Sequence, residues 1–99
     1  MSGGPVWGAA SEDLNATKLV WPAGAGPAEH AADRDVVYVV LEGAVTVTVD
    51  GVQNELAAGD GLIVDKASKR SLTAGPAGVT YFTAHLRRGG LEISGPSAV

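Results

Sequence analysis

Three side chains, those of His30, Tyr38 and His85, have the types and positions that could do chemistry. An imidazole titrates near neutral pH, so His30 could bond a ligand or act as a general acid or base. It could equally be a structural histidine whose ring is satisfied by a carbonyl or by water. Tyr38 offers a hydroxyl on an apolar body, which suits a pocket and a core alike. The sequence leaves open whether His85 faces a pocket or solvent.

Other patterns of catalytic residues are absent from the sequence. Cysteine does not occur, which removes disulfides, thiolate metal sites and thiol nucleophiles together. No Ser-His-Asp order, phosphate-binding glycine loop or paired-carboxylate spacing stands out. We interpret the charged run 33–35 as a solvated loop, and Trp7 and Trp21 as core or interface anchors.

Length and charge exclude several classes of protein. The chain has 99 residues, seven Lys and Arg, and eleven Asp and Glu, so one domain with a net charge of −4 is expected. That charge disfavours a nucleic-acid partner, whose phosphates would repel it. No apolar run approaches the roughly 18 residues that span a bilayer. Residues 1–10 lack the pattern of a secretory signal, so we expect a soluble cytoplasmic protein.

The clearest secondary-structure signal lies between residues 36 and 56. The run 36–41 is β-branched and aromatic, and predicts a strand buried on both faces. Residues 44–49 alternate valine with threonine or alanine, which predicts a strand with one apolar face. Asp50-Gly51 is a favoured pair for a two-residue type I′ hairpin leading into a partner strand at 52–56. If the strands are regular, His30 shares a face with Tyr38 and Val40.

Weaker signals predict more strands and no helix. The sequence favours turns at 42–43, 59–61 and 75–78, and a loop at 22–27. Eight or so short strands with turns between them predict an all-β sandwich or barrel. The weaker strand candidates are 17–21, 62–64, 68–73, 79–86 and 91–93.

At this point the chain resembles the cupins. Their first motif, G-x5-H-x-H-x3-4-E-x6-G, is similar to the segment from Gly24 through His30 to Gly43, which contains the run YVVLEG. Their second motif, G-x5-P-x-G-x2-H-x3-N, begins like residues 59–64. The resemblance covers about residues 14–87. It implies a double-stranded β-helix, the jelly-roll barrel of RmlC-like cupins, with a central pocket.

The metal ligands that the resemblance implies are largely substituted. Cupins typically hold a divalent metal with three His and one Glu; of these positions His30 keeps the first, whereas Ala32, Val36 and Arg70 fill the others. Alanine and valine have no lone pair, and arginine only donates. Asp35 would reach the Glu position only through a one-residue shift, which a regular strand forbids. We therefore predict no cofactor, with a site for Fe, Mn, Ni or Zn as the alternative.

Arg70 takes an interior position under the same resemblance. A buried guanidinium needs a partner, either a protein carboxylate or an anionic ligand. The alternative is an arginine near the barrel mouth that reaches water, or an exposed turn at 69–71.

Three functions follow as hypotheses. The first is a barrel that binds a small anionic or carbonyl-containing molecule without metal. The second is a cupin-type enzyme, either a metal-dependent dioxygenase, isomerase or epimerase, or a metal-free catalyst using His30. The third is a partner module with no ligand. Whether the chain is an enzyme stays open at this point. The expected pocket residues are His30, Tyr38, Val40, Arg70 and His85.

Self-association is expected from the two apolar faces of residues 36–41. Only one face can line the barrel, so the other needs cover from the N-terminal strand or from a second chain. We expect a single cupin domain over residues 1–99, with an N-terminal strand at 5–8 and a frayed tail at 94–99. We expect a homodimer formed by sheet extension, in which residues 6–7 or 18–21 take part.

Overall fold

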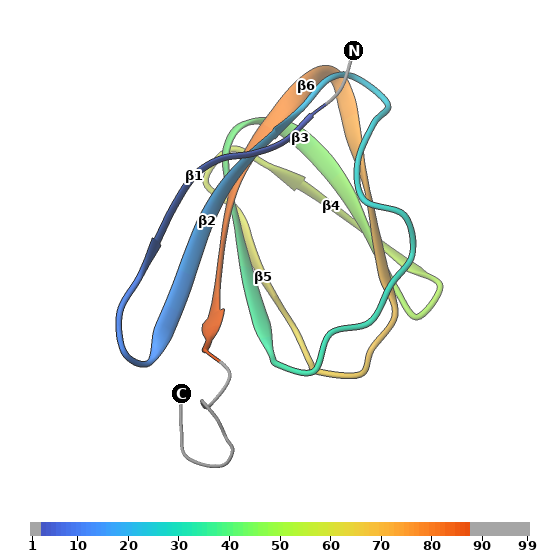
Figure 1. Ribbon diagram of the computed structural model, residues 1–99. Coiled ribbons are helices and arrows are strands. Elements are labelled where there is room, and N and C mark those ends of the chain that lie inside the picture. The colour runs from blue at the N-terminus through green and yellow to red at the C-terminus, as the bar shows by residue number, and fades with distance from the viewer. Residues whose placement is uncertain (1–2, 88–99) are drawn as a thin grey trace.

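The computed structural model describes residues 3–87 and consists of six strands that pair antiparallel (Figure 1). The expected short strand at 91–93 and the tail at 94–99 lie outside these residues. No helix long and apolar enough to cross a membrane is found in the described part. The strands are β1 (Gly4–Ala10), β2 (Leu14–Trp21), β3 (Val36–Val49), β4 (Val52–Ala57), β5 (Gly61–Val64) and β6 (Arg70–Leu86).

Two long strands, β3 and β6, tie the sheet into a barrel. The strand order is β1-β2-β6-β3-β4, and β5 pairs with the first half of β3. The first layer holds β1, β2, β5, the first half of β3 and the second half of β6. The second layer holds β4 and the remaining halves of β3 and β6. The all-β jelly-roll prediction is confirmed.

The prediction of eight or so short strands is wrong at two places, because two expected turns lie inside strands. Glu42-Gly43 belongs to β3 and residues 75–78 belong to β6. The β3–β6 register shifts at Val40/Glu42 and again at Gly43/Val45, which marks bulges. Gly43 and Gly78 have φ of 77° and 79°, so each strand bends from one layer into the other without ending.

The hairpin between β3 and β4 forms as predicted. Asp50 and Gly51 both have positive φ, 49° and 85°, as a type I′ turn requires. The turn sets the register so that Val45 pairs with Leu56, and both side chains are buried.

The core fills the space between the two layers. Its buried apolar side chains come from alternate positions on the strands, as the period of two predicts. The run 36–41 is not buried on both faces: Val36, Tyr38 and Val40 are buried, but Val37 and Val39 are only half-buried. Strand β1 extends the sheet beside β2, so it does not cover that outer face. The core residues are Val36, Tyr38, Val40, Val45, Val47, Leu56, Val64, Leu72, Ala74, Val79 and Tyr81.

The segment 24–30 completes the barrel wall along the first half of β6. Its backbone bonds to β6 include Gly24 N–H to Ala74 O, Ala74 N–H to Ala25 O, Leu72 N–H to Pro27 O, and a reciprocal pair between His30 and Arg70. This pairing fixes His30 at the barrel edge, although no regular strand carries it.

Candidate functional site

A cavity of about 240 Å³ opens between the two layers. Its walls are contributed by β2, β3, β6 and the segment 24–30, so it lies inside the barrel. Polar groups converge in it on an otherwise apolar surface, which is the usual composition of a ligand site. The lining residues are Thr17, Leu19, Pro27, His30, Val36, Tyr38, Leu72, Tyr81 and Thr83.

His30 stands at the exposed edge of this cavity with its ring held in one orientation. Its Nδ1 lies 2.8 Å from the carbonyl oxygen of Ala28. A carbonyl oxygen only accepts, so Nδ1 carries the hydrogen and donates it. In the neutral ring, Nε2 is then left with its lone pair. His30 is therefore equipped to accept a hydrogen bond or a proton from a molecule in the cavity.

Tyr81 is the most buried polar residue of the cavity lining. The indole Nε1–H of Trp21 donates to the Tyr81 hydroxyl oxygen over 3.2 Å. Indole nitrogen is only a donor, so the phenolic hydrogen of Tyr81 remains to be donated elsewhere. Burial raises the pKa of Tyr81 to about 12, against the smaller opposing effect of the Trp21 hydrogen bond. Tyr81 therefore stays protonated, and remains a donor, throughout the ordinary pH range.

The raised pKa predicts a loss of stability in strong alkali. The unfolded tyrosine ionises from about pH 10, whereas the folded one holds its proton to about pH 12. Between these values the unfolded state has lost more protons, so the free energy of unfolding falls as pH rises, by about 2–3 kcal/mol in total. Below pH 10 this contribution is fully present.

Urea unfolding of the wild type and of Tyr81→Phe at pH 9 and pH 11.5 measures the effect. We expect the free energy of unfolding to fall more between these pH values in the wild type, because the variant has no hydroxyl at position 81 to ionise. Equal falls in both proteins would contradict the assignment of the raised pKa to Tyr81.

Tyr38 and two threonines add hydroxyls around the same space. The Tyr38 and Tyr81 rings lie 6.0 Å apart at 50° to one another. Thr83 is opposite both Tyr38 and Thr17 in the strand register, so the three side chains point inward at one level of the barrel. The cavity thus offers several hydroxyl donors within an apolar wall.

Arg70 lies inside the barrel but does not line the cavity. Its side chain is fully buried, so the placement near the mouth with contact to water is wrong. Its guanidinium donates from Nη2 to the carbonyl oxygens of Asp65 and Ser68, both over 3.0 Å, and from Nε to Ser68 O over 3.3 Å. These partners are backbone carbonyls and not carboxylates. Nη1 is buried without a hydrogen-bond partner.

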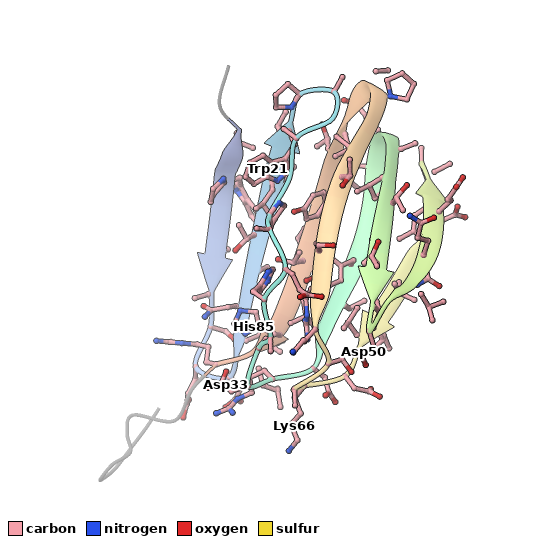
Figure 2. The ribbon with its side chains drawn as sticks, turned by 90° about the vertical axis from the view of Figure 1, so that its right-hand side faces the viewer. Trp21, Asp33, Asp50, Lys66 and His85 are labelled. Atoms are coloured by element: carbon pink, nitrogen blue, oxygen red, sulfur yellow. The ribbon has the colours of Figure 1, made fainter. Side chains whose placement is uncertain are left out.

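Val40 and His85 lie outside the cavity lining. Val40 is 1% exposed in the core. The half-buried His85 sits beyond Thr83 on β6, opposite Asn15, and its Nδ1 donates to the carbonyl of Leu86 over 2.9 Å. Figure 2 shows His85 and Trp21 at opposite ends of the β2–β6 pair.

The residues at the expected metal positions do not fit a divalent cation. Among them only His30 has a lone pair that could bind a metal, because Ala32 and Val36 carry none and Arg70 presents a positive charge. Asp35 does not replace Glu, since its side chain is on the outside and accepts the backbone N–H of Lys66 over 2.8 Å. Residues 3–87 contain no cluster of three or more His, Cys, Asp or Glu arranged for a metal.

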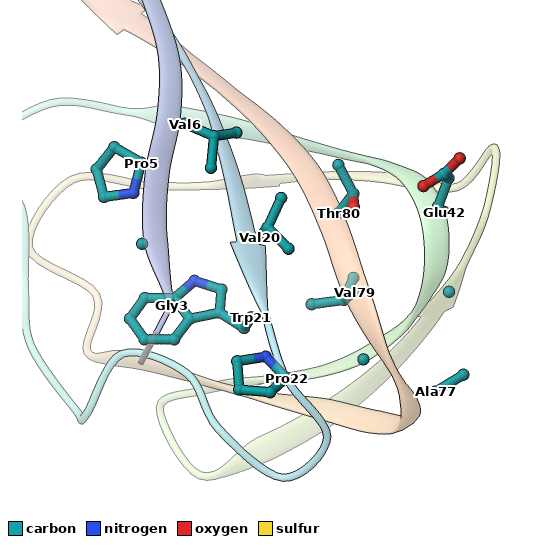
Figure 3. A pocket seen from close by; sticks show the side chains of 13 residues that line it. Gly3, Pro5, Val6, Val20, Trp21, Pro22, Glu42, Ala77, Val79 and Thr80 are labelled. Atoms are coloured by element: carbon teal, nitrogen blue, oxygen red, sulfur yellow. The ribbon is translucent and has the colours of Figure 1, made fainter. Parts of the chain in front are cut away.

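A larger hollow of about 600 Å³ lies beside the end of β2, next to residues 77–80 of β6 (Figure 3). Trp21 and Glu42 stand on opposite sides of it, and most of its other walls are glycine, proline, alanine and valine. Glu42 is the one ionisable side chain that lines it. Three polar side chains line this hollow, against five in the smaller interior cavity, so we take the interior cavity as the candidate site.

Four site residues were missed from the sequence: Thr17, Trp21, Tyr81 and Thr83. Trp21 was assigned to the core or an interface, and Tyr81 was one position of a strand candidate. The available signal was the alternation in residues 79–85, which places Tyr81, Thr83 and His85 on one face. The contact between Trp21 and Tyr81 joins residues 60 positions apart, so no local pattern indicates it.

Comparisons with known proteins agree with this architecture. No curated protein matches the chain significantly. The chain is 30% identical to an RmlC-like cupin from Shewanella frigidimarina, with a TM-score of 0.72 over 78% of this chain and 68% of that one. KdgF from Halomonas sp. is 24% identical, with a TM-score of 0.73 over 87% and 78%.

A third structure concerns a metalloprotein. Bacillus subtilis oxalate decarboxylase, described with Mn(II) centres, is 17% identical, with a TM-score of 0.71 over 77% of this chain and 22% of that one. At this identity the likeness extends to the fold alone. The family model for the cupin domain matches residues 18–75, more than half of the chain. This match and the jelly-roll barrel show that the chain belongs to the cupin family.

Proposed function

We propose that the barrel cavity binds a small molecule through a carbonyl or carboxylate oxygen, without a metal. The observation that carries the proposal is the pairing of Trp21 with Tyr81. That bond uses the Tyr81 oxygen and leaves its hydrogen for a ligand, and an oxygen acceptor is the group that satisfies it. The cavity is smaller than the roughly 300–1,000 Å³ of drug-sized ligand sites, so it suits a small molecule.

The other polar groups give the bound molecule a direction. Tyr38 and Tyr81 would hold the acceptor oxygen deep in the barrel, whereas His30 Nε2 would accept from a hydroxyl near the edge. Arg70 lies one inward-facing position from Leu72 in the cavity wall and has no carboxylate among its hydrogen-bond partners. Its positive charge favours a carboxylate over an amine in that space.

Benzoate and its neutral analogue benzamide test this proposal. We expect calorimetry to detect both, with benzoate the tighter, and Tyr38→Phe to weaken each about tenfold, the value of one hydrogen bond of about 1.4 kcal/mol. Binding should be unchanged after treatment with a chelator. Thr73→Val, on the exposed outer face of β6, is the matched control for loss of one hydroxyl.

Two results would overturn the proposal. One is the absence of binding by either probe, together with native mass spectrometry that finds no molecule retained from the expression host. The other is binding that disappears with the chelator and returns with Mn²⁺ or Zn²⁺, because the metal would then hold the ligand.

Acid–base catalysis at His30 is the second candidate function. It is favoured by the hydrogen bond to Ala28 O, which orients the ring and leaves Nε2 able to take a proton. A metal-free isomerase or epimerase would use such a group. Deuterium uptake from D₂O into a retained ligand, abolished in His30→Gln, would distinguish this chemistry from binding alone.

A further inference from the structure

The outer face of the first layer is an apolar surface with no cover within residues 3–87. The registers place its side chains in rows across the strands, and one row runs Trp7–Lys18–Phe82–Val39–Gly61. The Trp7 and Phe82 rings are 6.2 Å apart. The flanking rows supply further apolar side chains: Leu14, Ala16, Val20, Val37, Ile63, Ala84 and Leu86.

The same two long strands carry a polar outer face in the second layer. On β3 the outward positions are Val37 and Val39 in the first layer, but Thr46 and Thr48 in the second. On β6 the second-layer half comes first, and its outward positions are Ser71 and Thr73; the first-layer half follows, with apolar outward side chains within residues 82–86. β-Propensity does not account for the difference, because valine and threonine both favour strands. The difference between halves indicates that only the first layer is covered in the working protein.

The exposure of these side chains agrees with a missing cover. Ile63 is 66% exposed, Leu86 59%, Leu14 51% and Trp7 49%. Five strands about 4.8 Å apart, with about six residues each, give roughly 500 Å² of flat area. Side chains standing on that plane raise the accessible area toward the about 800 Å² per partner of a standard stable interface. The surface is therefore large enough for a specific protein contact.

Two opposite charges on this surface identify the partner. Lys18 lies on β2 and Glu42 on β3, both facing outward, in neighbouring rows about 12 Å apart. Consider a two-fold axis that lies in the interface plane, midway between Lys18 and Glu42 and perpendicular to the line joining them. It places Lys18 of each copy over Glu42 of the other copy. Such self-complementarity is what an isologous dimer requires. We propose that a second copy of this chain covers the first layer, face to face, around Phe82 and Val39.

This arrangement differs from dimerisation by sheet extension. The backbone of residues 18–20 is already paired on both sides, with β1 and with β6, so those residues can contribute side chains but no strand pairing. Among the first-layer strands, β1 has a free edge toward which a partner strand could add. Face packing and edge pairing therefore depend on different residues.

Light scattering after size exclusion, on the full chain at micromolar concentration, tests the proposal. We expect a mass of twice 9.9 kDa for the wild type. Val39→Glu and Ile63→Glu should each weaken the dimer at least about 30-fold and give monomers. Ile63 is largely exposed, so its variant should fold even if Val39→Glu does not. Thr73→Glu, which adds the same charge to the second layer, should leave the dimer intact.

Charge reversal separates a second copy from any other partner. Lys18→Glu should weaken the dimer, and the double variant Lys18→Glu/Glu42→Lys should restore it, because the restored pair exists only between identical chains. A monomeric wild type overturns the proposal. So does a dimer that survives both Val39→Glu and Ile63→Glu, since its contact would then lie away from this face, for example at a strand edge.

Discussion

Replacing Arg70 with alanine is expected to lower the free energy of unfolding by about 3–5 kcal/mol. The substitution removes three hydrogen bonds to the carbonyls of Asp65 and Ser68, and leaves a cavity where a fully buried side chain stood. For a domain of about 100 residues each kcal/mol shifts the melting temperature by about 4–8 °C, so it should fall by at least about 12 °C. Thermal unfolding followed by circular dichroism measures the change.

Arg70→Met separates volume from hydrogen bonding. Methionine refills much of the space and removes the buried charge together with the unpartnered Nη1, both of which cost free energy. The two carbonyls of residues 65 and 68 nevertheless lose their donor. We expect Arg70→Met to recover about half of the alanine loss. A change of less than about 1 kcal/mol in Arg70→Ala would mean that the guanidinium does not hold this loop.

Gly43→Ala is expected to cost about 3–5 kcal/mol in the free energy of unfolding. Gly43 has φ of 77°, where an L side chain costs about 1–2 kcal/mol. A Cβ at this position would also overlap the backbone carbonyl of Gly78 on the neighbouring strand. Because a backbone cannot move aside as a flexible side chain can, the bulge that bends β3 between the layers should be disrupted. Urea unfolding measures the loss.

Gly24→Ala is the matched control for this substitution. Gly24 has almost the same φ, 76°, but a Cβ there meets no atom within 4 Å. The control variant should show only the conformational cost of about 1–2 kcal/mol. If both variants lose the same free energy of unfolding, the close approach of β3 and β6 does not explain the glycine at position 43.

The parts of the fold that could be predicted are those set by residues close together in the sequence. The valine alternation at 45–49 and the Asp50-Gly51 turn determine a hairpin from neighbouring residues alone. The strand path through Glu42-Gly43 was not predictable in this way. A glycine at positive φ serves a turn or a bulge equally well, and the difference is decided by Gly78 on a strand far along the chain.

In the candidate site too, residues within a local pattern could be predicted, whereas contacts between distant residues could not. His30 and Tyr38 follow from the motif and from alternation, and both line the cavity. A buried Arg70 was one of two alternatives from the sequence, and the other, a position near the barrel mouth, is wrong; its carbonyl partners were not expected. Carbonyls of a loop carry no signature in sequence, because every residue has one. Only the folded chain shows that this arginine supports a loop and that Tyr81 is held by Trp21.

The continuity of β3 and β6 has a consequence for how the molecule folds. Each strand belongs to both layers, and their pairing joins Val49 to Arg70 at one end and Val37 to Ala84 at the other. Neither layer can therefore fold independently from local hairpins before the other layer forms. The barrel must close over long loops in one cooperative event, which places it among the slower-folding small domains, on the millisecond-to-second scale.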